Sequence, residues 1–267
     1  MPDVYAEIIN VDQPMLETIA EALEQRSADP QQVEMQKRYF AWLDLPPGAN
    51  VLEGGCGTGA VARHLASFTK SSKVFGLDPS PYFIEKAKEL GKNYPSLEFQ
   101  VGDARAMPYE DASFDAVIFH TCLCHVPDAE EAVAEAYRIL RPGGKLAVFD
   151  GDYATTSFSL GEHDPLQQCS DAMMEAFVHD IWLTRKIPGI LRDKGFAIDR
   201  MDAHGFVQSS KPDYMISIID RGADILQTSG QADGTMATAL KTEARRRADA
   251  GDFYGFINFI SVIASRS

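Results

Sequence analysis

The chain has 267 residues, of which 45% are hydrophobic, so one α/β domain can bury a core without disulfides or metal ions. Its 39 acidic and 25 basic side chains give a net charge of −14, which disfavours nucleic acid and anionic membranes as partners. The sequence shows no basic segment followed by an apolar core at its N-terminus and no apolar run of about 18 residues. We therefore expect a cytoplasmic protein without membrane insertion.

The first elements predicted are two helices, over residues 15–26 and 30–44, from the spacing of their apolar positions. Asp29 is the expected N-cap of the second helix, and Pro30 lies in its first turn. Five strands then alternate with helical patterns, and the strands are expected at 50–55, 73–78, 97–103, 114–120 and 144–151. This alternation predicts a doubly wound, mostly parallel sheet that binds its ligand at the carboxyl ends of the strands.

The alternation stops after Asp150. Residues 152–182 are predicted to form a helical insertion that is part of a lid, and two C-terminal strands are expected at 196–203 and 253–264. Trp182 and the stripe of Phe253, Phe256 and Phe259 are expected in the core rather than in a substrate cage. We predict a single domain over 1–267, made of a helical cap (1–46), a cofactor-binding core (47–151), and lid insertions with C-terminal strands (152–267).

The segment EGGCGTG, residues 53–59, follows the first predicted strand and precedes a helical pattern. Its glycines, Gly55, Gly57 and Gly59, allow the backbone to turn sharply and to approach a ligand without Cβ clashes. The following helix would point its N–H groups at that ligand. Gly55, Gly57 and Ala60 also satisfy the G-x-G-x-x-G/A pattern of a dinucleotide fold, so an NAD-dependent dehydrogenase is one alternative.

Acidic residues end the next two predicted strands. Asp78 ends the second strand, where its carboxylate can accept hydrogen bonds from both hydroxyls of a ribose. Asp103, followed by Ala104, ends the third strand, where a carboxylate can accept from an adenine amino group. A dinucleotide dehydrogenase does not require the acidic residue after the third strand. The presence of both Asp78 and Asp103 therefore favours a different adenosine-containing cofactor.

Four segments appear in a characteristic order: VLEGGCGTGA, VFGLDPS, VGDARAMPYEDASFD and HVPDAEEAVAEAYRILRPGGKL. Over residues 37–151 they resemble the class I S-adenosylmethionine-dependent methyltransferases, especially the small-molecule branch that includes enzymes of ubiquinone and menaquinone biosynthesis. The resemblance implies a seven-stranded sheet of order 3-2-1-4-5-7-6, in which strand 7 is antiparallel. It also implies methyl transfer to a small-molecule oxygen, nitrogen or carbon nucleophile.

The resemblance assigns parts of S-adenosylmethionine to residues of this chain. Glu53 and the loop of Gly55, Gly57 and Gly59 would border the methionine part, Asp78 the ribose, Asp103 and Ala104 the adenine, and His120 the space beside the sulfonium. Gly54 departs from the family, which usually has an apolar residue there, and this puts the rigidity of the loop in doubt.

His120, at the end of the fourth predicted strand, is the candidate general base for a hydroxyl or protonated amine acceptor. His125, Asp150, Asp152 and Tyr153 flank the same edge of the sheet and are alternatives. A carbon or thiolate acceptor need not use a base.

Two features of the sequence argue against nucleic-acid bases and metal ions as ligands. By the same resemblance, HTCL in place of an N/D-P-P-Y/W tetrapeptide after the fourth strand argues against methylation of nucleic-acid bases. The cysteines do not have the spacing of a metal site, because the closest pair, Cys122 and Cys124, has no second pair to complete it. Binding of the cofactor without methyl transfer is a further alternative, and neither the acceptor nor the oligomeric state follows from the sequence.

Overall fold

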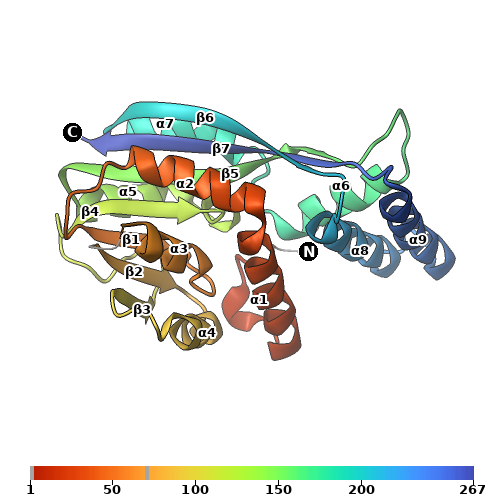
Figure 1. Ribbon diagram of the computed structural model, residues 1–267, viewed down its shortest axis with the longest axis horizontal. Helices are drawn as coiled ribbons and strands as arrows, with labels where there is room; N and C mark the ends of the chain where they lie inside the picture. Colours follow the sequence, from red (N-terminus) through yellow and green to blue (C-terminus); the bar gives the residue numbers. More distant parts are fainter. Residues whose placement is uncertain (1–2, 70–71) are drawn as a thin grey trace.

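The computed structural model describes residues 3–69 and 72–267, and its centre is a sheet of order β3-β2-β1-β4-β5-β7-β6. The strands are β1 (Asn50–Gly54), β2 (Lys73–Asp78), β3 (Leu97–Val101), β4 (Phe114–His120), β5 (Leu140–Ser157), β6 (Phe196–Gln208) and β7 (Gly255–Arg266). Neighbouring strands from β3 to β5 pair in parallel, and β7 pairs antiparallel with both β5 and β6. The predicted fold class and strand order are confirmed (Figure 1).

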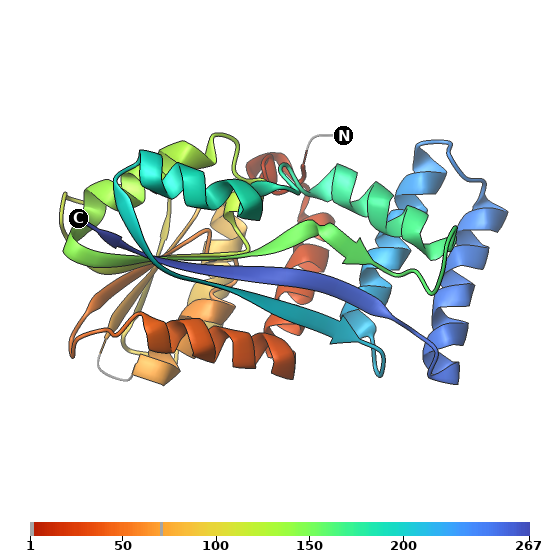
Figure 2. The ribbon, with the colours of Figure 1, turned by 90° about the horizontal axis from the view of Figure 1, so that it is seen from above.

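Nine α-helices surround the sheet within the described ranges. They are α1 (Gln13–Ala28), α2 (Pro30–Trp42), α3 (Ala60–Thr69), α4 (Pro81–Gly91), α5 (Ala129–Ile139), α6 (Leu166–Phe177), α7 (Leu183–Asp193), α8 (Asp213–Thr228) and α9 (Gly234–Ala250). Figure 2 shows α2 on one face of the sheet and α5 and α7 on the other, with α6, α8 and α9 grouped beyond its end. None of these helices has the length and apolar character needed to cross a bilayer.

The last three strands extend past the core toward α6, α8 and α9. β5 ends at Ser157 and β6 at Gln208, so both are longer than the sequence indicates, and residues 152–157 are strand rather than helical insertion. The cause is β7, which supplies partners for both strands out to Ser157↔Phe256 and Gln208↔Gly255. Only the remainder of the expected insertion is helical, at α6.

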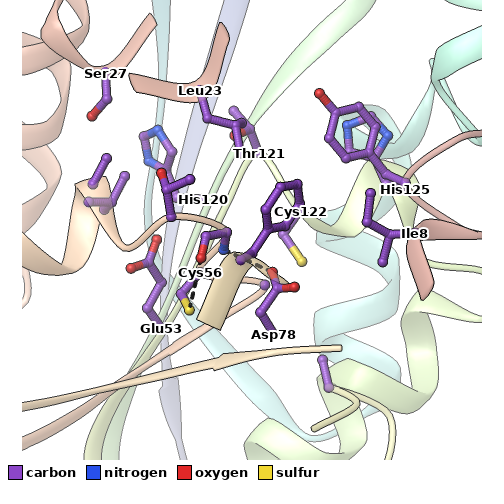
Figure 3. A pocket seen from close by; sticks show the side chains of 18 of the residues that line it. Ile8, Leu23, Ser27, Glu53, Cys56, Asp78, His120, Thr121, Cys122 and His125 are labelled. Carbon is purple, nitrogen blue, oxygen red and sulfur yellow. Dashed lines mark hydrogen bonds between the residues drawn. The ribbon is translucent and has the colours of Figure 1, made fainter. Parts of the chain in front are cut away.

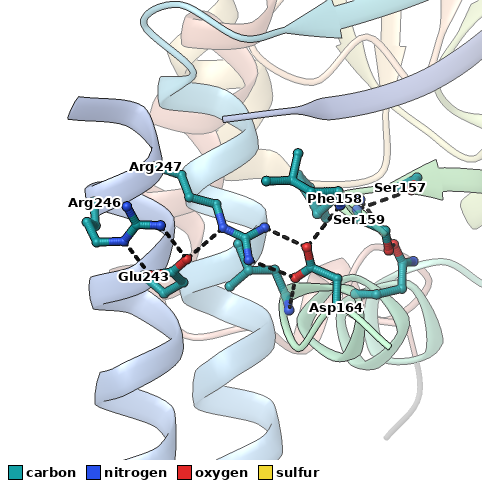
Figure 4. A network of polar contacts seen from close by, with 10 residues as sticks. Ser157, Phe158, Ser159, Asp164, Glu243, Arg246 and Arg247 are labelled. Carbon is teal, nitrogen blue, oxygen red and sulfur yellow. Dashed lines mark hydrogen bonds and ion pairs between the residues drawn. The ribbon is translucent and has the colours of Figure 1, made fainter. Parts of the chain in front are cut away.

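A buried ion pair fastens α9 to the loop that precedes α6 (Figure 4). Arg247 donates two hydrogen bonds to the carboxylate of Asp164, at 2.6 and 3.1 Å, and a third to Glu243. Burial alone would raise the pKa of Asp164, but hydrogen bonds from Arg247 and two backbone N–H groups outweigh it and hold that pKa below its ordinary value. Because both charges are paired, the helical group is fixed at its outer end.

Helices α6 and α8 approach so closely that a side chain at Gly222 has no room. A Cβ atom there would lie 1.9 Å from the carbonyl oxygen of Cys169, which is helix backbone and cannot rotate away. We expect Gly222→Ala to lower the free energy of unfolding by about 1–3 kcal/mol, measured by urea denaturation, because the helices must separate. Gly189→Ala is the matched control: nothing lies within 4 Å of that Cβ, so this helical substitution should stabilise by about 0.5–1 kcal/mol. Equal effects of the two would contradict the packing explanation.

Candidate functional site

A cleft with an empty volume of about 940 Å³ opens at the carboxyl ends of β1, β2 and β4, under α1 and α2 (Figure 3). The predicted residues that line it are Glu53, Gly55, Gly57, Asp78, Asp103, Ala104 and His120. Gly59 does not line the cleft, because the ring of Phe99 fills the space beside it, where a Cβ would come within 2.7 Å.

The glycine-rich loop after β1 holds its backbone in conformations that favour glycine. Gly55 has φ +68° and Gly57 has φ +51°. The N–H groups of Gly55 and Cys56 both donate to the carbonyl of Leu77, at 2.7 and 3.0 Å, and so fix the loop against the end of β2. A Cβ at Gly55 would lie 2.2 Å from the sulfur of Cys122, so the loop and the segment after β4 touch only because this position has no side chain.

Asp78 connects the glycine-rich loop with the start of α4. Its Oδ2 accepts a hydrogen bond from the Gly57 N–H at 2.8 Å, and its Oδ1 accepts one from Ser80 at 2.9 Å. Burial raises the pKa of this carboxyl to about 6, although both N–H groups oppose the increase. A carboxylate has about four acceptor positions, so about two are left for ligand hydroxyls.

Glu53 is 2% exposed and lines the cleft with an oxygen, Oε2, that has no hydrogen-bond partner among the residues the structure describes. Burial raises the pKa of the carboxyl to about 8, against the effects of the Ala62 N–H and the charge of Arg63. An unpartnered buried carboxylate oxygen is costly unless a donor or a cation reaches it. Glu53 is therefore suited to bind an ammonium group.

The pKa of Glu53 makes ammonium binding depend on pH. The free protein holds a proton on Glu53 up to about pH 8, and an ammonium ligand favours the ionised form, so binding must release that proton. We expect the affinity for S-adenosylhomocysteine to rise up to about tenfold between pH 6.5 and 7.5, and calorimetry in buffers of different ionisation enthalpy should show the release. Asp78, with a pKa of about 6, titrates largely below this window. Glu53→Gln should bind more weakly and with little pH dependence; a wild-type affinity that stays constant over this range would contradict the assignment.

Asp103 and Ala104 lie at the rim of the cleft, after β3. The carboxylate of Asp103 pairs with the guanidinium of Arg105, at 2.7 Å, and this hydrogen bond lowers its pKa. An adenine amino group would share an acceptor that is already partly used. This competition was not predicted from the sequence, although Arg105 is only two residues away from Asp103.

His120 ends β4 inside the cleft and is 5% exposed. Its Nδ1 lies 3.0 Å from the hydroxyl of Tyr39, and its ring stacks on Phe149 with centroids 4.6 Å apart. Burial, with smaller contributions from the charges of Arg26 and His64, holds the pKa of His120 well below its ordinary value. The imidazole is therefore neutral near pH 7, and the hydroxyl of Tyr39 lies against its Nδ1.

The structure adds a polar wall from α1 and α2 that the sequence analysis missed. Ser27, Gln32 and Gln36 line the cleft, and each has a buried side-chain atom with no partner in the described part of the chain. Gln32 and Gln36 are buried one helical turn apart, at 0% and 1% exposure. Polar residues at this spacing on the apolar face of a predicted helix are the signal that would have indicated a ligand.

The buried carboxylates at the carboxyl ends of a doubly wound sheet define a site for a nucleoside-like cofactor. Residues 52–148 match the model of the family described as "Methyltransferase domain". This part of the chain is therefore similar to a methyltransferase domain.

Three relatives show where the sequence similarity lies. A protein of transposon TN4556 from Streptomyces fradiae, with no described activity, is 32% identical over 58% of this chain and 46% of its own length. A sterol 24-C-methyltransferase from Saccharomyces cerevisiae is 40% identical over 44% of this chain and 32% of its own. A 2-phytyl-1,4-naphthoquinone methyltransferase from Thermosynechococcus vestitus is 36% identical over 43% and 52%. The chain thus spans about half or less of the length of these relatives.

Solved structures share the fold at low sequence identity. A candidate methyltransferase from Bacillus halodurans has a TM-score of 0.62 and 20% identity, covering 86% of this chain and 98% of that one. A geranyl diphosphate methyltransferase, solved with its diphosphate and sinefungin, has a TM-score of 0.54 and 16% identity, over 88% and 77%. The [4+2]-cyclase SpnF has a TM-score of 0.55 and 21% identity, over 86% and 80%. The similarity extends beyond residues 52–148 to most of the fold.

Proposed function

We propose that this protein transfers a methyl group from S-adenosylmethionine to a small-molecule acceptor. The observation that carries the proposal is the buried Glu53, whose free oxygen faces the same cleft as Asp78 and the glycine-rich loop of a methyltransferase domain. A ligand with an ammonium group at one end and ribose hydroxyls beside it would satisfy both carboxylates. S-adenosylmethionine has both features.

Residues along the cleft support binding of this cofactor. Glu53 would accept a hydrogen bond from its ammonium group, Asp78 would accept from the ribose hydroxyls, and Asp103 with Ala104 would border the adenine. When bound, the cofactor supplies an electrophilic methyl group on a sulfonium. The protein would align an acceptor with that methyl group, and such positioning can lower a barrier by about 7–11 kcal/mol.

His120 is the proposed general base for a hydroxyl or amine acceptor. If its Nδ1–H donates to Tyr39, its Nε2 has a free lone pair and can take a proton from the acceptor. Burial raises the pKa of Tyr39, so the phenol keeps its proton and can donate or accept in this bond. The base role therefore depends on the tautomer that Tyr39 supports.

Calorimetry tests the cofactor assignment directly. We expect the wild-type protein to bind S-adenosylmethionine and S-adenosylhomocysteine and not NADH. Asp78→Ala should weaken binding by about 1.5–3 kcal/mol, because a buried charged acceptor for two hydroxyls is lost. Asp249→Ala, an exposed position on α9, is the control and should leave the affinity unchanged. An unchanged affinity in Asp78→Ala would remove Asp78 from the site, and NADH binding would favour the dehydrogenase alternative.

A screen with a labelled methyl donor then separates methyl transfer from binding alone. Transfer of label to a small acceptor supports the proposal; tight cofactor binding without transfer over a broad acceptor panel would favour an enzyme that uses the bound cofactor in another way. The charge of −14 supports a small acceptor over nucleic acid. We also propose a cytoplasmic location, supported by four buried cysteines that are all free thiols.

A further inference from the structure

A second cavity, with an empty volume of about 450 Å³, adjoins the cofactor cleft. The two share four lining residues, Tyr5, Leu23, Arg26 and His125. The second cavity lies between α1, α6 and α8, and Figure 1 shows α1 standing between the sheet and α8. It is therefore placed to hold a molecule that reaches the methyl-donor site from the side of the helical group.

Most of the wall of this cavity is apolar. Met173, Met174 and Phe177 come from α6, and Ile218 comes from α8. Methionine side chains adapt to ligands of irregular shape because they are unbranched and polarisable. Such a wall favours the apolar body of a ligand over a sugar or a free amino acid.

Arg26 stands where the two cavities meet. Its Nη2 donates to the hydroxyl of Thr121 at 2.6 Å, and Tyr214 is a second hydrogen-bond partner. Both partners are neutral. No carboxylate lies within 4.0 Å of the guanidinium in residues 3–69 and 72–267. The charge of Arg26 also contributes to the lowered pKa of His120, which places it close to the proposed site of chemistry.

Arg221 is the second cation of the cavity. It donates to the carbonyl and the hydroxyl of Ser217, one turn earlier in α8, and lies 5.9 Å from the ring of Phe177. It too has no ion pair with any residue that the structure describes. Arg221, Arg26 and Tyr5 all line this cavity, so both guanidinium groups are available to one ligand.

Among residues 3–69 and 72–267, no carboxylate forms an ion pair with either of these two arginines. The nearby carboxylate of Asp3 is already used, since it accepts from the N–H groups of Tyr5 and His179 and lies 2.9 Å from the Nδ1 of His125. Elsewhere, the half-buried Arg63 and the buried Arg247 are each paired with a carboxylate. Both guanidinium groups are half-buried and donate hydrogen bonds to uncharged groups, so they can pair with an anion that a ligand brings.

We infer that the acceptor is a small amphiphilic molecule whose carboxylate or phosphate binds between Arg26 and Arg221 and whose apolar body lies against α6 and α8. The identification of this ligand as the methyl acceptor rests on the proposed function. The anion site itself is tested independently of it. Guanidinium groups match both oxyanions in geometry, and a chain of net charge −14 would otherwise repel such a ligand.

Calorimetry with simple probes tests the inference on the protein saturated with S-adenosylhomocysteine. Octanoate carries a carboxylate, octyl phosphate carries a phosphate, and octan-1-ol is the neutral probe of equal chain length. We expect at least one anionic probe to bind about tenfold or more tightly than octan-1-ol, and the tighter of the two identifies the anionic group. Arg221→Gln should remove this preference while leaving the affinity for S-adenosylhomocysteine unchanged, because Arg221 does not line the cofactor cleft. Arg26→Gln should also remove it.

Arg246→Gln is the matched control, because it removes the same charge from an exposed position on α9 and should keep the preference. Equal binding of the three probes, no binding of either anionic probe, or an unchanged preference in both cavity variants would overturn the inference. The same experiment tests the proposed function separately. If S-adenosylhomocysteine does not bind but the anionic probes bind through the two arginines, the anion site is supported and the cofactor assignment is wrong. If the cofactor binds and the probes show no preference, only the anion site falls.

Discussion

Gly55→Ala is expected to reduce the affinity for S-adenosylhomocysteine more than a hundredfold. The new Cβ would lie 2.2 Å from the sulfur of Cys122, and the position has φ +68°, which alanine tolerates poorly. To relieve the contact the loop must move away from the segment after β4, and this moves the backbone that is proposed to border the methionine part of the cofactor. A shift of about 1 Å in such a segment is enough to disrupt a positioned ligand. Calorimetry gives the affinity, and circular dichroism shows whether the fold is retained.

Two further variants separate the contact from the backbone strain. Gly48→Ala introduces alanine at φ +78°, where nothing lies within 4 Å of the new Cβ. This variant should bind the cofactor normally, while the backbone strain should lower its free energy of unfolding by an amount similar to that in Gly55→Ala. Adding Cys122→Ala to Gly55→Ala removes the sulfur and should restore part of the affinity. Normal binding by a folded Gly55→Ala protein would show that the loop does not need this close approach.

His120→Ala is expected to lower kcat by about 10²- to 10⁴-fold if the acceptor is a hydroxyl or an amine, the usual contribution of a general base. Cofactor affinity should change little. Tyr39→Phe removes the hydroxyl that lies 3.0 Å from the His120 Nδ1. It should lower kcat by a smaller factor, because the imidazole remains but its tautomer is no longer fixed by this hydrogen bond.

The same variants distinguish a base from a contact residue. If His120 only borders the cofactor, His120→Ala will raise the Kd of the cofactor and leave the rate at saturation nearly intact, because binding is lost equally from ground and transition states. Both ligands must be saturating for this comparison. An unchanged kcat at saturation for a hydroxyl or amine acceptor would exclude the base role.

The strands at the centre of the sheet were predictable because the hydrophobic pattern of each strand and the residues that follow it indicate the same strand end. β2 and β4 end at Asp78 and His120, the residues that the sequence indicates, since short buried apolar runs are followed directly by polar residues. The lengths of β5 and β6 were not predictable in this way. Their outer residues are held by β7, a partner that is distant in the sequence, and alternation in one strand does not show how far its partner extends.

The site was predictable only where it lies directly after a strand. Glu53 and Asp78 could be placed because parallel strands end at one edge of a sheet. Arg26 lies on a helix whose direction across that edge depends on tertiary packing, so the local sequence pattern does not indicate its proposed role. Trp182, expected in the core, is 47% exposed, and that expectation was wrong; Phe259, expected there too, is buried. An aromatic side chain indicates burial only when its neighbours supply a surface to pack on.

The position of β7 has a consequence for how the chain folds during synthesis. In the described part of the chain, β6 is hydrogen-bonded in the sheet only to β7, and β7 enters between β5 and β6. A ribosome-bound chain that lacks residues 255–266 can therefore assemble β1 to β5 but has no strand to hold β6. Strands β1 to β5, the part of the sheet that carries Glu53 and Asp78, can form early from local units of parallel strands. β6 can join the sheet only after β7 has inserted between β5 and β6, and such long-range pairing is intrinsically slow. Until then β5 exposes an unpaired strand edge, and a nascent chain in this state is open to pairing with a neighbouring chain.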